Sequence, residues 1–322
     1  MKKYIVFLLS IISITVFFQG CITNNETNNK ELYVSLTADA KYTSIQSAIN
    51  DSIDYGIIYV SAGVYYENIK VNKPVSIIGS SNKTIIDGNY IENVIDITSH
   101  NVTLINLTIQ HANSTTNNDE IRNGLNILSN NITITHCKIN DNKIGIHLSN
   151  NNFNKIENNS FENCYYGIWA ESSADNIIRN NYFNNNSAYG MYIYTYCDRN
   201  QIQHNEYTNN LIALRVKGNS NDISNNEFFK NQGGLYLCCS AVNNTVYHND
   251  FVNNYDYNGK GNYHNQWYND ELMQGNYWDD YNGTDLNNDT IGDSSYLISS
   301  RNISGDEEII IDKYPLMQPI IK

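Results

Sequence analysis

Short apolar segments separated by asparagine-rich turns recur along the middle of the chain, from Ile134 to Asn254. One pass reads Ile156-x-x-Asn159-x-Phe161. Apolar residues at alternate positions indicate strands and not helices. In five successive passes the turn asparagines are spaced 22, 24, 21 and 23 residues apart, and they are Asn159, Asn181, Asn205, Asn226 and Asn249. A repeat of about 22 residues with three short apolar segments predicts a solenoid of stacked strands.

The repeat predicts an all-β fold, a single-stranded right-handed parallel β-helix whose coils lie about 4.8 Å apart. Equivalent inward side chains of successive coils then stack in columns. We expect the turn asparagines to form one column, because Asn tolerates the left-handed conformation of a tight corner and its amide can bond to the neighbouring coils. We expect a second column of aromatic rings, formed by Phe161, Phe183, Tyr207, Phe228 and Phe251. Both columns are structural in this prediction.

Sheet edges at the two ends of a solenoid need caps. The apolar spacing in residues 42–50 predicts a short amphipathic helix as the N-terminal cap. The predicted division of the chain is a signal peptide (1–20), a lipid-anchored polar tether (21–31), an N-terminal cap with the first coils (32–90), the β-helix repeats (91–270) and a C-terminal cap with an Asp/Asn-rich loop (271–322).

The first residues predict export. Lys2 and Lys3 precede an apolar run over residues 4–18, which is short for a membrane span. Cys21 follows Gly20 directly and resembles the lipobox cysteine of lipoproteins, whose thiol is lipidated. We therefore predict a protein exported to the cell surface and held on the membrane through Cys21. The alternative is an ordinary signal peptide that is cleaved nearby.

Composition excludes some partners. The formal net charge is −13, and charged residues make up 16% of the chain, against roughly 25% in typical proteins. A negative protein repels phosphate backbones, so nucleic acid is not expected as a partner. An acidic, hydroxyl-rich and amide-rich surface suits sugars or cations. The cysteines after Cys21 are odd in number and irregularly spaced, which predicts neither a disulfide framework nor a zinc site.

Two segments carry a family resemblance. IYVSAGVYYENIKVNKPVSIIGSSNKTIIDG (58–88) resembles the first coils of pectin-esterase-like and pectate-lyase-like β-helices. GNYWDDYNGTDLNNDTIGD (275–293) and DKYPLM (312–317) resemble the end of NosD-like surface proteins. The resemblance implies a right-handed parallel β-helix and, for NosD itself, an accessory role in maturation of the copper site of nitrous oxide reductase. The catalytic strings that the pectin-active enzymes would imply do not occur in this sequence.

The repeat frame places several side chains outward on one sheet, in two neighbouring columns. Aromatic rings at strand spacing suit sugar rings, while Arg, Lys and Glu can bond hydroxyls or carboxylates. The candidate carbohydrate-binding residues are His147, Trp169, Tyr192, Arg215 and Tyr236 in one column, and Glu171, Tyr194 and Lys217 in the next. The alternative is that large residues simply cover the sheet. A catalytic version needs Tyr194, Lys217 or Arg215 to take a proton from a uronic acid sugar.

The C-terminal loop offers a candidate metal site. Asp285, Asn287, Asp289 and Asp293 present oxygen atoms around a turn at Gly292, as in Asp-rich calcium loops, but the distal Glu of an EF-hand is missing. Ca²⁺ is the expected ion, and a polar turn-rich cap is the alternative. No Cys-His or Met-rich cluster supports a copper site.

Together these patterns favour an exported, surface-anchored β-helix that is non-catalytic and binds polysaccharide or another cell-envelope component. One alternative is a polysaccharide lyase or epimerase. Another is a NosD-like accessory protein in copper-site maturation.

Overall fold

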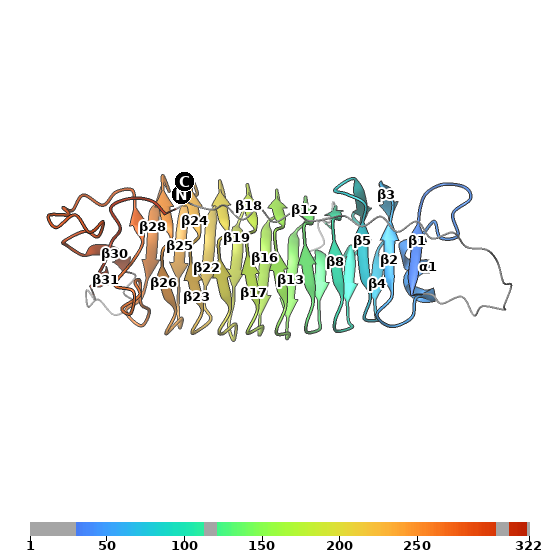
Figure 1. The fold of residues 1–322 in the computed structure, drawn as a ribbon, viewed down its shortest axis with the longest axis horizontal. Helices are drawn as coiled ribbons and strands as arrows, with labels where there is room; N and C mark the ends of the chain where they lie inside the picture. The colour runs from blue at the N-terminus through green and yellow to red at the C-terminus, as the bar shows by residue number, and fades with distance from the viewer. Residues whose placement is uncertain (1–29, 113–120, 301–308, 321–322) are drawn as a thin grey trace, which may run out of the picture.

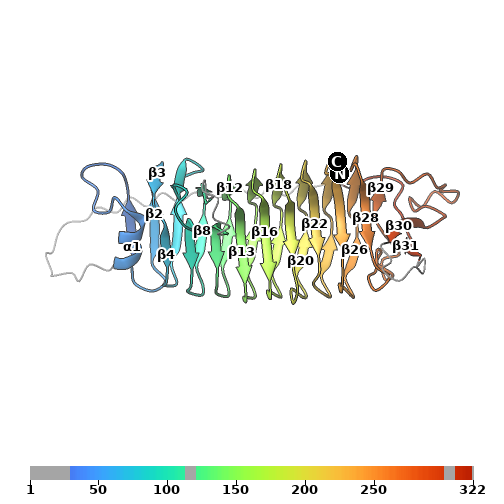
Figure 2. The ribbon, with the colours of Figure 1, turned by 180° about the vertical axis from the view of Figure 1, so that it is seen from behind.

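The computed structural model describes residues 30–112, 121–300 and 309–320. The chain winds into an elongated solenoid whose strands lie across its long axis (Figure 1). Figure 2 shows the same succession of coils from behind, with α1 at one end and β30 and β31 at the other. Cys21 and the predicted signal peptide lie outside the described residues, so the domain boundaries and the lipid anchor stay predictions.

The strands form three sheets, named here first, second and third in the order in which the chain passes through them. The first sheet contains β1 (Glu31–Val34), β2 (Ile57–Val60), β5 (Ser76–Gly79), β8 (Thr103–Ile105), β11 (Thr133–Thr135), β14 (Lys155–Glu157), β17 (Ile177–Arg179), β20 (Gln201–Gln203), β23 (Asp222–Ser224) and β26 (Thr245–Tyr247). The second contains β3 (Gly63–Tyr66), β6 (Thr84–Asp87), β9 (Thr108–Gln110), β12 (Lys138–Asn140), β15 (Ser160–Glu162), β18 (Tyr182–Asn184), β21 (Glu206–Thr208), β24 (Glu227–Phe229), β27 (Asp250–Val252) and β29 (Tyr277–Trp278). The third contains β4 (Ile69–Val71), β7 (Ile95–Ile97), β10 (Asn123–Ile127), β13 (Ile144–Ser149), β16 (Tyr166–Glu171), β19 (Tyr189–Ile193), β22 (Ile212–Val216), β25 (Gly233–Leu237), β28 (Tyr257–Gly261), β30 (Tyr296–Ser300) and β31 (Ile310–Asp312).

Each coil pairs in parallel with the next, in the register that the repeat predicted. Ile156 of β14 lies beside Ile178 of β17, and Phe161 of β15 lies beside Phe183 of β18. The hairpin of β30 and β31 is antiparallel. The prediction of an all-β parallel β-solenoid is therefore confirmed.

Aromatic rings form the predicted column inside the second sheet. The ring centroids of Phe161 and Phe183 lie 4.7 Å apart, and each further step in the column is similar. Trp278 extends the column beyond Phe251, with centroids 4.3 Å apart. Every ring in the column is almost completely buried. Removing one such ring typically costs about 3–5 kcal/mol, so the column is a main source of stability.

The predicted asparagine column is a hydrogen-bonded ladder. Asn181 Nδ2 donates to Asn205 Oδ1 at 3.0 Å and to the carbonyl of Ile156 at 2.8 Å. The left-handed residue of each corner is the one before the ladder asparagine, for example Asn180 with φ 54°. Two further ladders occupy the other corners and are formed by Asn154, Asn176, Asn200, Asn221 and Asn244, and by Asn186, Asn210, Asn231 and Asn254. The ladders satisfy backbone groups that the turns leave unpaired.

The helix α1 (Ile45–Asp51) lies at the N-terminal end of the solenoid and contacts β1, β2 and β4. It begins three residues later than predicted, because the Ser44 side chain accepts a hydrogen bond from Ser47 N as the N-cap. The Glu67 carboxylate also accepts from the first backbone amides, including Ile45 N at 2.8 Å. The role of α1 as a cap stays a prediction. No helix within the described ranges is long and apolar enough to cross a membrane.

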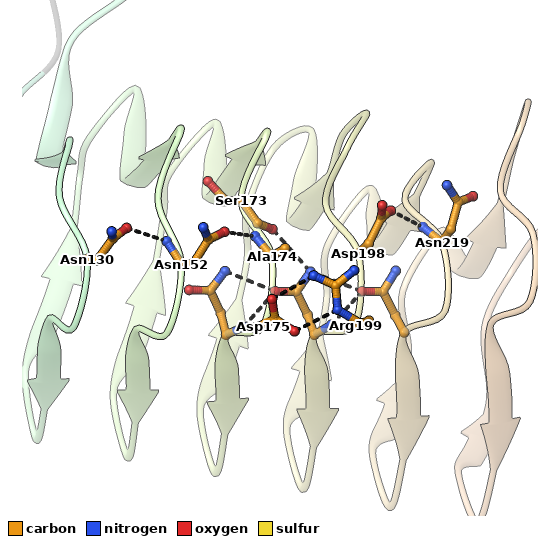
Figure 3. A network of polar contacts seen from close by, with 11 residues as sticks. Asn130, Asn152, Ser173, Ala174, Asp175, Asp198, Arg199 and Asn219 are labelled. Carbon is orange, nitrogen blue, oxygen red and sulfur yellow. Dashed lines mark hydrogen bonds and ion pairs between the residues drawn. The ribbon is translucent and has the colours of Figure 1, made fainter.

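Polar side chains also link the turns between the third and first sheets (Figure 3). Asn130 Oδ1 accepts from Asn152 N at 2.7 Å, and Asn152 Oδ1 accepts from Ala174 N at 2.8 Å. Ala174 has no side-chain acceptor to continue this series. On the same coils, Arg199 forms two hydrogen bonds with the Asp175 carboxylate. This exposed ion pair contributes little stability but holds two neighbouring turns together.

Candidate glycan-binding face

The outward face of the third sheet carries the predicted carbohydrate-binding residues. Strand pairing places His147, Trp169, Tyr192, Arg215 and Tyr236 side by side on consecutive coils, and Lys260 extends the column. Glu171 pairs with Ser149 in the next outward column. Tyr194 and Lys217 hold the equivalent place on later coils, where their amides bond to the carbonyls of Ala170 and Ile193. The structure therefore brings all of these residues to one face.

Three tyrosines that the sequence analysis missed belong to the same face. Tyr166, Tyr189 and Tyr257 lie in a third column, with Tyr257 beside Gly233. The rings of Tyr166 and Tyr189 are stacked with centroids 5.4 Å apart, and Tyr189 lies 5.0 Å from Tyr192. Gly233 makes room for Tyr257, since an added Cβ would lie 2.5 Å from the Tyr257 ring. The Tyr-Gly pairs at residues 166–167 and 189–190 were the signal that could have identified the start of this column.

Arg215 occupies the centre of the aromatic cluster. Its Nη1 donates to Tyr189 Oη at 2.8 Å, and its Nε donates to Cys238 Sγ at 3.2 Å. The guanidinium carbon lies 5.1 Å from the Tyr192 ring centroid and 5.5 Å from that of Tyr236. Nη2 has no hydrogen-bond partner among the described residues, so one side of the fork stays available to an acceptor.

Two lysines share this face with Arg215. Lys217 Nζ lies 4.1 Å above the Tyr194 ring, and Lys260 Nζ lies 5.7 Å from the Tyr236 ring. Lys217 lies on the same coil as Arg215 and Lys260 lies two coils further along, so three cations share this face of a protein with net charge −13. Such a face attracts anions selectively.

The far end of the face has a different character. His147 Nε2 lies 3.2 Å from Glu171 Oε1, and Ser149 Oγ donates to the same oxygen at 3.2 Å. Burial lowers the pKa of His147, and this effect outweighs the opposing influence of Glu171. The contact is therefore a hydrogen bond from a neutral imidazole at pH 7, and not an ion pair.

The predicted exposure is wrong for Tyr192, whose exposed fraction is 9%. Tyr166, Tyr189, Tyr194 and Arg215 contact its ring from several sides. Burial raises the pKa of Tyr166 to about 12 and holds the pKa of Tyr192 far above its usual value. Neither phenol can therefore act as a general base at neutral pH. Trp169 is partly buried, and its Nε1 has no partner among the described residues.

In the predicted calcium loop, side-chain oxygens accept hydrogen bonds from backbone amides of the loop itself. Asp285 accepts from Asp289 N at 3.1 Å and from Thr290 N at 3.0 Å. Asn287 Nδ2 donates to Asp289, and Asp293 accepts from Leu286 N at 2.9 Å. Across the described parts of the chain, no group of three or more His, Cys, Asp or Glu could hold a metal ion. The calcium site stays a prediction, and the melting temperature with and without Ca²⁺ would test it.

A groove of about 920 Å³ lies near the corner between the first and second sheets. Polar side chains line it, among them Ser160 and the ion pair of Lys138 with Glu162 at 2.8 Å. Tyr182 and His136 carry the rings in its lining. No stacked pair of rings is found among the residues that line this groove. A platform for an extended glycan is better formed by the aromatic cluster.

Comparison with protein families decides the relationship. The family described as periplasmic copper-binding protein (NosD) matches residues 86–283. The chain belongs to the NosD family. Comparison with curated proteins finds no match.

Solved structures share the fold of this NosD family member. XylC in complex with xylose has a TM-score of 0.58 at 11% identity, covering 72% of this chain and 68% of XylC. The A-module of the mannuronan C-5 epimerase AlgE6 from Azotobacter vinelandii has a TM-score of 0.52 at 18% identity, covering 67% and 74%. DFA-IIIase from Arthrobacter chlorophenolicus A6 in complex with DFA-III has a TM-score of 0.55 at 11% identity, covering 72% and 68%. At these identities the likeness shows a common β-helical fold and no more.

Proposed function

We propose that this NosD family member is an exported, surface-anchored protein that binds acidic polysaccharide along the third sheet without modifying it. Arg215 carries the proposal, because aromatic rings hold it in place while its Nη2 stays available. Lys217 and Lys260 add positive charge to the same face. A uronate carboxylate could bond to the guanidinium while the apolar face of its ring lies on a tyrosine. Anchoring through Cys21 would hold this face at the cell surface.

The repeat distance supports a glycan that runs along the solenoid. Equivalent side chains recur about every 4.8 Å, which is comparable with the length of one pyranose unit. An extended chain could therefore meet a similar environment on each coil. Structural neighbours bound to xylose and to DFA-III support carbohydrate as the ligand class.

A glycan array tests the proposal. The protein carrying Cys21→Ser is applied to acidic and neutral oligosaccharides at low and at high salt. We expect acidic glycans to be bound, and more weakly at high salt because ions screen partly exposed charges. Equal binding of neutral glycans would contradict the role of Arg215. Absence of glycan binding would contradict the proposed function.

The lyase or epimerase alternative is less well supported. His147 is neutral and could accept a proton, but it lies three coils from Arg215, about 14 Å by strand spacing. The two groups could not act on the same sugar ring. Ultraviolet absorbance of polyuronates incubated with the protein should show no unsaturated product.

The copper description of the family does not fit the side chains. Copper sites in proteins use clusters of Cys, His or Met. Among the described residues, no group of three or more His, Cys, Asp or Glu is placed to hold a metal ion, and Met191 is a core residue. We therefore assign no copper chemistry to this chain.

A further inference from the structure

Two adjacent cysteines end the outward column next to Arg215. Cys238 follows β25 directly, and its Sγ lies 3.1 Å from Cys239 Sγ. Cys238 is buried, whereas Cys239 is exposed and has a left-handed backbone with φ 62°. Sulfur atoms this close are within reach of a covalent bond after a small side-chain movement. The pair can therefore react as a unit.

The other described cysteines are buried inside the solenoid. Cys137 and Cys164 precede the asparagine ladders, and their backbone amides donate to Asn159 and Asn186. Burial raises the pKa of each thiol to about 12. Cys197 Sγ accepts from Ser173 N, and burial raises its pKa to about 12 as well. Buried thiols with a raised pKa react slowly, so we expect these three cysteines to stay reduced.

The pair is joined to the candidate site through one contact, from Arg215 Nε to Cys238 Sγ at 3.2 Å. Burial raises the pKa of Cys238 to about 11, although Arg215 opposes this rise. Cys238 is therefore a thiol at rest, and the exposed Cys239 is the sulfur that meets a reagent first. Any change at Cys238 removes or moves an acceptor of Arg215.

We infer that Cys238 and Cys239 form a reversible thiol modification site, which closes to a vicinal disulfide and moves Arg215 on the glycan-binding face. The oxidant is a small-molecule disulfide. Cys239 gives up its proton and attacks one sulfur of this oxidant, which forms a mixed disulfide and breaks the small disulfide. The departing small thiolate takes up that proton and leaves as a thiol. Cys238 then attacks the Cys239 sulfur and gives its proton to the departing small thiolate. The protein loses two hydrogen atoms in all, and one small disulfide becomes two small thiols.

The geometry makes this closure easy to reverse. Adjacent Cα atoms are about 3.8 Å apart across a trans peptide, below the usual 4.4–6.8 Å range of disulfides. A strained disulfide is reduced more readily than a relaxed one. Closure draws Cys238 Sγ toward Cys239, so Arg215 Nε loses its acceptor. The effect on glycan binding rests on the proposed function, whereas the sulfur chemistry does not depend on it.

The first experiment maps the cysteines of the full chain. The protein is incubated with oxidised or reduced glutathione and alkylated, and each cysteine is identified in its peptide. We expect a Cys238–Cys239 disulfide after oxidation, while Cys137, Cys164 and Cys197 stay reduced. In Cys238→Ser, glutathione should remain attached to Cys239. Stable glutathione on Cys239 of the unmodified chain would overturn the inference. Cys239→Ser, which replaces the exposed cysteine, should leave Cys238 unreacted. This variant keeps the test decisive if Cys238→Ser does not fold.

The second experiment measures the consequence for the face. Affinity for an oligogalacturonate should fall about fivefold on oxidation, the effect of one lost hydrogen bond. Near-ultraviolet circular dichroism should also change, because Arg215 contacts the stacked tyrosines. Cys239→Ser should give the same result in both measurements after treatment with oxidised or with reduced glutathione. A mapped disulfide without a spectral change would contradict the coupling to Arg215. Complete absence of glycan binding with a spectral change would contradict the proposed function alone.

Discussion

On the same coils, the outward faces of the second and third sheets carry side chains of opposite charge. The second sheet carries a column of acidic side chains that begins after Tyr182 and contains Glu206, Glu227 and Asp250. The third sheet carries Arg215, Tyr236 and Lys260 at the corresponding level of the solenoid. Figures 1 and 2 show that one set of coils supports both sheets. The fold therefore leaves the outward residues free to differ, and function is to be sought in what one face has and the other lacks.

On the acidic face of the second sheet, neighbouring carboxylates repel one another. Burial raises the pKa of Glu227, and Glu206 and Asp250 raise it further. On the third sheet, rings separate the cations and contact them favourably. Repulsion on one face and ring contacts on the other indicate that the aromatic face is organised to hold cations in defined positions.

The largest expected effect comes from the interior that both faces share. Ile178→Asp places a charge in the fully buried core, so it should unfold the solenoid and remove both faces together. The matched control is Ile177→Asp, whose side chain points outward on the first sheet and is partly exposed. Thermal melts followed by circular dichroism should show a cooperative transition for the control and none for Ile178→Asp. Equal stability of the two variants would contradict the register.

Arg215→Ala should have the largest effect on glycan affinity among outward substitutions. Loss of a charge-assisted hydrogen bond costs about 1.5–3 kcal/mol, which is roughly 10-fold to 150-fold in the dissociation constant. Arg215→Lys keeps the charge but lacks the planar fork, so it should recover part of the affinity. Glu227→Ala on the second sheet is the control and should change binding little. A stronger effect of Glu227→Ala than of Arg215→Ala, measured by calorimetry, would reverse the assignment of the two faces.

Trp169→Ala tests the aromatic part of the same face. Stacking platforms contribute about 1–3 kcal/mol, so affinity for an acidic glycan should fall roughly tenfold or more. The structure adds a cost in stability, because the Trp169 ring contacts His147 and Tyr166. Tyr182→Ala removes a partly buried ring from the second sheet and should leave binding unchanged. If Trp169→Ala lowers the melting temperature and affinity is unaffected, Trp169 is sheet cover.

The sequence was sufficient for the fold because the columns of Asn159 and Phe161 recur at a fixed period. It also identified the outward column of Arg215, since side chains alternate along each strand. It missed Tyr166 and Tyr189, because the glycine after each tyrosine interrupts the alternation at the start of the strand. The sequence repeat could not predict the burial of Tyr192, because neighbouring side chains on the same outward face cover its ring. The hydrogen bonds of Asp285 depend on loop conformation, which residue type alone does not determine.

The smallest expected effect concerns the charge of Glu227. Its carboxyl has a raised pKa in the folded state, so the unfolded chain ionises more readily and this group's stabilising contribution falls as pH rises through the folded pKa. Glu227→Gln should therefore raise stability at pH 7, by about 0.5 kcal/mol or less because solvent screens a partly exposed group. The difference in stability between Glu227→Gln and the unmodified protein should vanish below the usual pKa of Glu, about 4.3, where the Glu227 side chain is neutral like that of Gln. Glu157→Gln is the control, since Arg179 Nε lies 2.8 Å from Glu157 Oε1 in an ion pair and the loss of this charge should not stabilise the fold. Denaturant unfolding at pH 4 and pH 7 measures the stability of both variants. Destabilisation by Glu227→Gln at pH 7 would show that the Glu227 carboxylate stabilises the fold, against the repulsion inferred for the acidic column.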